Sequence, residues 1–129
     1  MKQITRRLKP GKDLKGEIEK MVKENNIKAG CILSVVGSLS KASLRLADGK
    51  KVKSWDKPFE IVSGTGTVSV NGCHIHIAIS DEDGDVFGGH LKEGCVVNTT
   101  AEIVLLVFPD TEYKRVFDEE TGYDELKTE

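Results

Sequence analysis

The chain has 129 residues, of which 38% are hydrophobic and 31% charged, with a formal net charge of −2. This length fits one domain, residues 1–129, with one modest core. The balanced charge lacks the basic footprint of an ordinary nucleic-acid-binding domain, and no apolar run is long enough to span a membrane.

The cysteines indicate the redox environment. Cys31, Cys73 and Cys95 are odd in number, widely spaced and set among apolar or small residues. This pattern favours reduced, buried thiols over a disulfide framework, and so predicts a cytoplasmic protein. The basic residues near the N-terminus are not followed by the apolar region of a secretory signal.

The first predicted elements are a strand and a helix. Polar and apolar residues alternate over residues 3–9, which is typical of a strand, and Pro10-Gly11 ends it. Asp13 is a good N-cap, and apolar residues then recur at helical spacing. These are Leu14, Ile18, Met21 and Val22. The pattern predicts one main amphipathic helix over residues 14–25.

Strand patterns dominate from residue 27 onward, separated by turn signals such as Asp48-Gly49 and Asn71-Gly72. The apolar run of residues 101–108 predicts a central strand covered on both faces. Residues 91–100 admit a second short helix, and residues 118–129 are expected to be mostly irregular. The fold class predicted is α+β, with a mostly antiparallel sheet of six to eight strands.

All three histidines lie between His74 and His90. Isoleucines alternate with His74 and His76, which places the two imidazoles on one face of a strand. The acidic segment 81–85 predicts a turn, and a return strand would bring His90 opposite Ile75. A one-residue bulge at Gly88-Gly89 would then turn His90 towards the other two histidines.

Three converging imidazoles are suitable ligands for zinc or a similar divalent metal. The competing interpretation is that the histidines only line the wetter face of a strand. The acids of residues 81–85 resemble a calcium loop superficially, but no glutamate closes a loop of the required length, so a solvated turn is favoured.

Five segments in this order carry a family resemblance. They are Val36-Gly37-Ser38-Leu39, Phe59-Glu60-Ile61-Val62-Ser63, His74-Ile75-His76-Ile77-Ala78, Gly88-Gly89-His90-Leu91 and Thr100-Ala101-Glu102-Ile103. Arg115, Asp118, Thr121-Gly122 and Glu125-Leu126 extend the pattern towards the C-terminus. Together they resemble the plant and prokaryote conserved (PPC) domain, specifically its stand-alone prokaryotic type.

The resemblance implies an α+β sheet fold that assembles as a homotrimer, and a regulatory role with DNA as a candidate partner. The DNA-binding element of the plant proteins is an Arg-Gly-Arg-Pro-type AT-hook. This sequence contains no such segment and no recognisable cluster of phosphate-neutralising cations. Arg6, Arg7, Lys9 and Lys12 would form a basic patch only if three chains brought them together.

The resemblance also implies a metal site, because His74, His76 and His90 match the prokaryotic pattern. The histidine pattern and the fold are similar to those of acetolactate decarboxylase, a zinc enzyme. Glu102 is the candidate second-shell or general-base group, against the alternative that it pairs with Arg45 or Arg115. Three hypotheses stay open: a DNA-associated trimer with a structural metal, a zinc enzyme acting on a small carbonyl or carboxylate compound, and a metabolite-sensing module.

Overall fold

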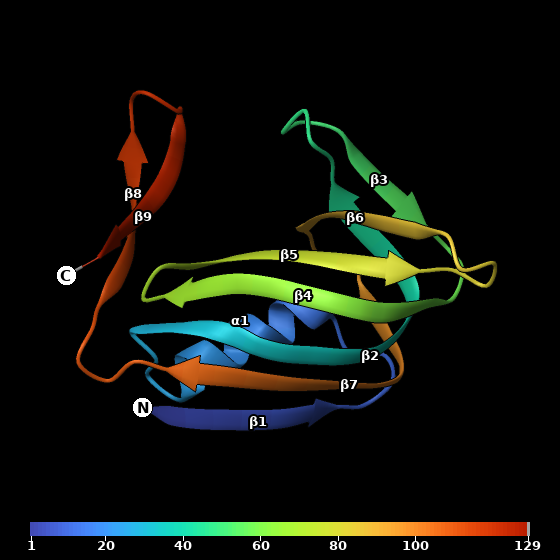
Figure 1. The fold of residues 1–129 in the computed structure, drawn as a ribbon, viewed down its shortest axis with the longest axis horizontal. Coiled ribbons are helices and arrows are strands. Elements are labelled where there is room, and N and C mark those ends of the chain that lie inside the picture. The colour runs from blue at the N-terminus through green and yellow to red at the C-terminus, as the bar shows by residue number, and fades with distance from the viewer. Residues whose placement is uncertain (129) are drawn as a thin grey trace.

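Nine strands and one helix form the part of the chain that this computed structural model describes, residues 1–128 (Figure 1). In chain order they are β1 (Lys2–Leu8), α1 (Leu14–Glu24), β2 (Ala29–Arg45), β3 (Val52–Trp55), β4 (Phe59–Ser69), β5 (Gly72–Ser80), β6 (Val86–Leu91), β7 (Val96–Val107), β8 (Tyr113–Asp118) and β9 (Tyr123–Thr128). None of these elements is a helix long and apolar enough to cross a membrane.

Seven strands form one antiparallel sheet in the order β1-β7-β2-β4-β5-β6, with β3 paired to β2. Strand β2 is 17 residues long, and register shifts interrupt its pairing with β7. Its first part pairs with β4, whereas Leu44 and Arg45 at its end pair with Leu91 and His90 of β6. The strands β2, β4, β5 and β6 therefore close on themselves, because β6 pairs with both β5 and the end of β2.

Helix α1 covers one face of the sheet (Figure 1). Its apolar side chains are fully or almost fully buried: Leu14, Ile18, Met21 and Val22. They share one hydrophobic cluster with the isoleucines of β5 and with Ile103 and Leu105 of β7. Apolar side chains that recur every 3.6 residues in the helix and every two residues in the strands thus pack into a single core.

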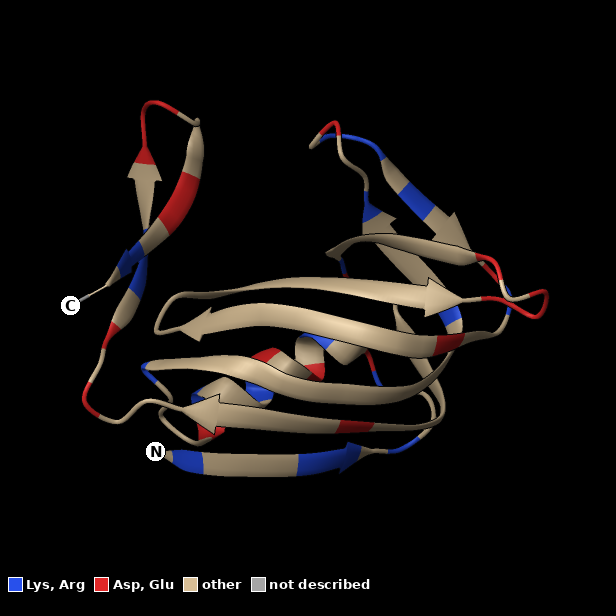
Figure 2. Cartoon of the chain, viewed as in Figure 1, with Lys and Arg blue, Asp and Glu red and all other residues tan. Residues whose placement is uncertain are grey.

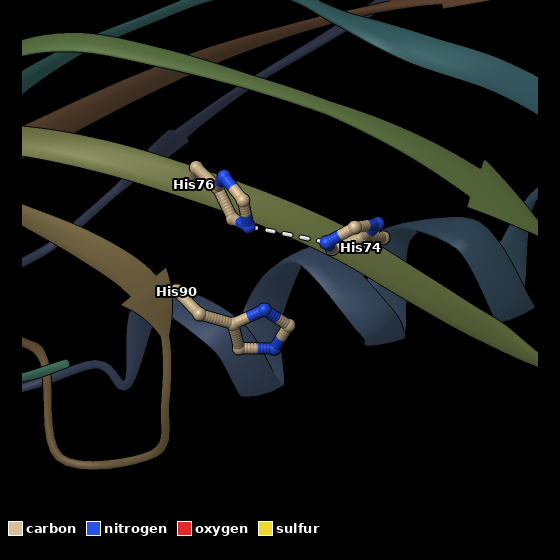
Figure 3. A group of neighbouring side chains, drawn as sticks. All are labelled: His74, His76 and His90. Carbon is tan, nitrogen blue, oxygen red and sulfur yellow. Dashed lines mark hydrogen bonds between the residues drawn. The ribbon is translucent and has the colours of Figure 1, made fainter. Parts of the chain in front are cut away.

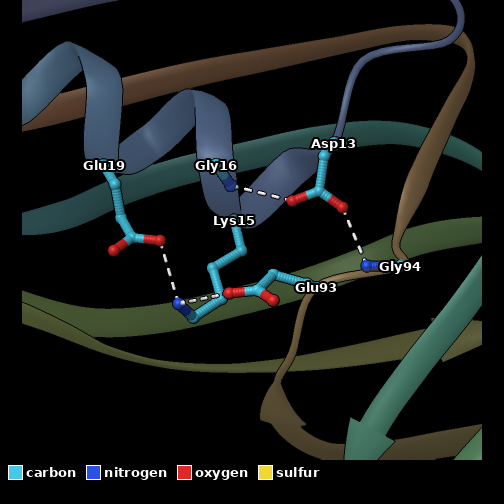
Figure 4. A network of polar contacts seen from close by, with 6 residues as sticks. All are labelled: Asp13, Lys15, Gly16, Glu19, Glu93 and Gly94. Carbon is cyan, nitrogen blue, oxygen red and sulfur yellow. Dashed lines mark hydrogen bonds and ion pairs between the residues drawn. The ribbon is translucent and has the colours of Figure 1, made fainter.

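Asp13 fixes where the helix begins (Figure 4). One carboxylate oxygen accepts a hydrogen bond of 2.9 Å from the Gly16 amide, and the other accepts one of 2.8 Å from the Gly94 amide. The first contact caps the helix, while the second joins it to the turn between β6 and β7. Lys15 adds ion pairs to Glu19 on the helix and Glu93 on the same turn.

The structure confirms the predicted helix, which ends at Glu24 instead of residue 25. The fold is mainly β, and α+β describes it broadly. Two expectations about the secondary structure were wrong. Strand β7 begins at Val96, which excludes the short helix, and residues 123–128 form β9, which pairs with β8 in a separate hairpin. The C-terminal segment is polar, but cross-strand backbone bonds give it regular structure.

Strand β7 lies between β1 and β2, but its outer face is less covered than its apolar composition suggested. Ile103 and Leu105 are fully buried, whereas Val104 and Leu106 are only half-buried and Glu102 is exposed. The run of residues 101–108 therefore has one face in the core and one face partly open to solvent.

We predict that Asp13→Ala lowers the free energy of unfolding by about 1–2 kcal/mol, because the helix loses its N-cap and Gly94 loses its acceptor. Urea unfolding followed by circular dichroism measures this change. Asp110→Ala, which removes an exposed carboxylate, is the control. Equal stability of the two variants would contradict the capping role of Asp13.

Candidate metal centre

The three histidines converge on one face of adjacent strands (Figure 3). His74 and His76 lie two residues apart on β5, so both project to the face opposite the buried isoleucines. His90 on β6 is the direct partner of His76 in the antiparallel register, and directly paired residues share a face. The β5–β6 hairpin therefore delivers all three imidazoles to one place.

The register reaches this arrangement without the bulge that the sequence suggested. Pairing runs unbroken from Ser80 and Val86 to His76 and His90, so the hairpin is centred on Asp83. The glycine directly before His90 has another role. A side chain at Gly89 would place its Cβ 2.6 Å from the Arg45 carbonyl oxygen, so glycine lets the end of β2 approach β6.

The distances suit a single metal ion. The Nε2 atoms of His74 and His76 are 3.1 Å apart, and one ligand atom from each of the three histidines lies within 4.8 Å of the others. Two nitrogen ligands of one tetrahedral zinc ion lie about 3.4 Å apart, since each Zn–N bond is ~2.0–2.1 Å long. The group therefore fits zinc with small side-chain adjustments.

The electrostatics favour neutral imidazoles, which are the form that binds metal. Burial, followed by the positive charge of Arg45 and the neighbouring histidines, lowers the pKa of His90 from 6.5 to about 4. Burial and then His76 and Arg115 lower the pKa of His74. The Nδ1 atom of His90 is also buried without a hydrogen-bond partner among the described residues.

A cavity of about 680 Å³, which we call the histidine cavity, opens beside His74 and His90. Its other charged and aromatic lining residues are Arg45, Asp48, Arg115, Tyr123, Asp124 and Glu125. Four of these belong to the β8–β9 hairpin, which rises from one end of the sheet (Figure 1). The cavity offers space for a small molecule beside the imidazoles.

Glu102 is not brought to the histidines within this chain. It is exposed on β7, where it lies opposite Arg7 of β1 and Val36 of β2. Strands β2 and β4 separate β7 from β5, a distance of about 14 Å at the usual strand spacing. Within residues 1–128 it forms no ion pair with Arg45 or Arg115.

Among the carboxylates that line the cavity, Glu125 is the one whose negative charge acts to raise the pKa of His74. Sequence reasoning noted Glu125 only as part of a pattern and missed Tyr123. Arg115 belonged to the same pattern, and Arg45 and Arg115 were also considered as partners of Glu102. The pairing of β2 with β6 brings Arg45 to the cavity, and the hydrogen bonds between Asn71 and Arg115 anchor the C-terminal hairpin there. No local sequence pattern reveals either contact.

The acidic turn of residues 81–85 also brings three carboxylates together, those of Asp81, Asp83 and Asp85. Asp81 pairs with Lys57 at 3.0 Å and accepts hydrogen bonds from the backbone amides of Asp83 and Asp85. These contacts are those of a carboxylate that stabilises its own turn, in agreement with the expected turn.

Comparison with known proteins shows which family this chain resembles. The family model described as "Plants and Prokaryotes Conserved (PCC) domain" matches residues 1–109. Two proteins named "Bifunctional protein GlmU", from two Synechococcus strains, are each 44% identical to this chain over 93% and 95% of its length. The matches cover 19% and 20% of those proteins, so the chain spans about a fifth of their length.

Solved structures agree over nearly the whole chain. A hypothetical protein from Salmonella enterica has a TM-score of 0.95 at 34% identity, with 99% of this chain and 93% of that chain covered. The metal-containing protein AF0104 from Archaeoglobus fulgidus has a TM-score of 0.86 at 32% identity, with 98% and 94% covered.

A third structure, described as a "putative dna binding protein" from Bacteroides thetaiotaomicron, has a TM-score of 0.88 at 21% identity, with 97% and 91% covered. At that identity the similarity concerns the fold alone. In this chain Lys and Arg lie at the ends of β1, on β3 and in the C-terminal hairpin, where acidic residues lie among them (Figure 2). Arg6 is engaged by Glu24 at 2.8 Å, and Arg7 donates to Thr100.

We predict that His90 of the metal-free protein titrates near pH 4 in NMR, because burial and Arg45 oppose its protonation. In the unfolded chain this histidine protonates near pH 6.5. Protonation of His90 therefore does not change the free energy of unfolding above that pH, and lowers it progressively as the pH falls from 6.5 towards about 4. His90→Asn should flatten this pH dependence. A titration midpoint near 6.5 would contradict the prediction.

Proposed function

This chain belongs to the Plants and Prokaryotes Conserved (PCC) domain family, and we propose that it binds one divalent metal ion, zinc, through His74, His76 and His90. The direct pairing of His76 with His90 carries this proposal, because it brings the third imidazole to the two on β5. The depressed pKa values of His74 and His90 support it, since neutral imidazoles are the binding form. The metal-containing relative AF0104 supports it independently.

The bound metal would face the histidine cavity, so we propose small-molecule binding as the function of the site. Three protein ligands leave a tetrahedral ion one open position, where the metal supplies Lewis acidity. The chain's own residues supply the walls: Arg45 and Arg115 contribute positive charge, and Glu125 is a carboxylate near His74.

This function has two possible forms, which differ only in whether the bound compound is chemically converted. In a metabolite-sensing module, the cavity holds a carbonyl or carboxylate compound and releases it unchanged. In a zinc enzyme similar to acetolactate decarboxylase, a general base also acts on the bound compound. Glu125 is better placed for that task than Glu102, because it lines the same cavity as His74 and His90. Glu102 keeps a role only if another chain brings it to the site.

A DNA-associated regulatory role is the second candidate. The observation that favours it is that Lys9 and Lys12 are exposed next to β1. A steep loss of DNA affinity with rising salt would support this role. Absence of DNA binding at low salt would exclude this role.

The three cysteines, all free thiols, support the proposed cytoplasmic location.

We also propose that the domain, residues 1–129, assembles as a homotrimer. The observation that supports self-association is an exposed apolar surface on adjacent strands β2 and β4, formed by Leu33, Val36 and Val62. These side chains are 59%, 51% and 54% exposed. Half-buried Val104 and Leu106 lie beside them on β7. Apolar side chains gathered in this way favour burial against other copies of the chain.

The metal site predicts about one zinc ion per chain in protein purified without chelator or affinity-tag metal. His76→Ala should reduce the zinc content to background and leave the fold intact, because the isoleucine face of β5 is unchanged. Mass spectrometry of the metal content measures both. Ser80→Ala, on the same strand, is the matched control and should retain zinc. Zinc retained by His76→Ala would overturn the proposed ligand set.

The assembly predicts that Val36→Asp converts the trimer into folded monomers, because each copy would bury a carboxylate at the contact. Light scattering coupled to size-exclusion chromatography measures the mass, and circular dichroism checks the fold. Val52→Asp, an exposed position on β3, is the control. An unchanged mass for Val36→Asp would exclude this surface as the contact.

A further inference from the structure

Two arginines in the histidine cavity have guanidinium nitrogens that form no hydrogen bond within residues 1–128. The Nε atoms of Arg45 and Arg115 are buried and have no hydrogen-bond partner among the described residues. Both arginines line the cavity together with His74 and His90. A buried cationic donor without a partner loses its hydration and gains no compensating bond, so it indicates a group that arrives from outside.

Arg115 is held in place from two sides. The Arg115 amide donates to the Asn71 side-chain oxygen at 2.7 Å, and the Asn71 side-chain amide donates back to the Arg115 carbonyl at 2.9 Å. The Arg115 Nη2 atom donates to Thr67 Oγ1 at 2.7 Å. The guanidinium is thus fixed to β4, and the backbone that carries it is fixed to the β4–β5 turn. All these partners are neutral, so they leave the charge of the guanidinium uncompensated.

Arg45 is held by the closure of the sheet. It is the register partner of His90, and its guanidinium carbon lies 5.9 Å from the centre of the Tyr123 ring. The two arginines therefore reach the cavity from two different strands, β2 and β8. Neither forms an ion pair within residues 1–128, although three carboxylates line the same cavity.

We propose that Arg45 and Arg115 bind the carboxylate or phosphate group of a small molecule beside the three histidines. Arginine presents a planar fork of donors that matches these oxyanions, and both arginines are already positioned. This inference rests on the proposed function of the histidine cavity and names the class of its ligand. It adds two residues that act on the ligand through their own charge.

The surroundings select a small ligand over a polyanion. A cavity of about 680 Å³ accommodates a compound of metabolite size. Asp48, Asp124 and Glu125 on the wall repel further negative charge, which disfavours the repeated phosphates of nucleic acid. The positive field of the arginines also acts to lower the pKa values of His74 and His90, so their charge reaches the imidazoles.

The test is to titrate the zinc-loaded protein with pyruvate, inorganic phosphate and the neutral ester methyl pyruvate. Calorimetry measures affinity, and NMR of the arginine Nε–H groups reports directly on the two arginines. We expect pyruvate or phosphate to bind and to shift the Nε–H signals of Arg45 and Arg115, but not that of Arg6. Methyl pyruvate should bind at least tenfold more weakly than pyruvate, an expected loss of ~1.4 kcal/mol or more.

Variants of the two arginines test whether these residues bind the oxyanion. Arg115→Gln and Arg45→Gln should each weaken oxyanion binding about tenfold or more with unchanged zinc content. Arg115→Lys should give an intermediate affinity, because the charge remains while the fork is lost. Lys114→Gln is the matched control, since Lys114 is the neighbouring cation on β8, pairs with Glu112 and lies outside the cavity lining.

The outcomes separate this inference from the metal site. A protein that holds zinc but binds neither anion, or binds methyl pyruvate as tightly as pyruvate, would overturn the oxyanion site and leave the metal site standing. Arginine-dependent oxyanion binding in a protein that takes up no metal would support the oxyanion site while the metal proposal fails. Folded Gln variants with unchanged affinity would also overturn it, and urea unfolding verifies that they are folded.

Discussion

The pairing of β6 with two different strands is the constraint on which the site depends. His90 has His76 on one side and Arg45 on the other, so one row of paired residues contains two imidazoles and a guanidinium. This row exists because register shifts in β2 turn its end towards β6, and because Gly89 removes the side chain that would collide with β2. Without the closure, His90 would still meet His76, but Arg45 would not lower its pKa.

The elements that the sequence predicted well are those with local causes. Helical spacing and Asp13 defined α1 within one residue, and alternation placed His74 and His76 on one face of β5. The convergence with His90 was also predicted, but through a bulge that the register makes unnecessary. The error was one residue in the pairing, since His90 lies opposite His76 and not Ile75. A shift of one residue exchanges the two faces because side chains alternate with a period of two.

What could not be predicted depends on long-range pairing. Glu102 drew attention as an acid in an apolar strand, yet the order of strands places β2 and β4 between it and the histidines. Arg115, Tyr123 and Glu125 reach the cavity because Asn71, at the turn between β4 and β5, anchors the start of the C-terminal hairpin. No spacing within the polar tail carries this information, since the anchor is 44 residues away.

The residues that line the histidine cavity come from two parts of the chain, one inside and one outside the segment that the family model matches. The three histidines and Arg45 lie within residues 1–109, which the family model matches, whereas the hairpin that carries Arg115, Tyr123 and Glu125 begins at Tyr113. The proposed metal ligands therefore lie within the segment that the family model matches, and the hairpin part of the cavity wall lies beyond it, although the Salmonella enterica and Archaeoglobus fulgidus structures cover 99% and 98% of this chain. Changes in the hairpin alter charge and shape without disturbing the pairing of β5 with β6.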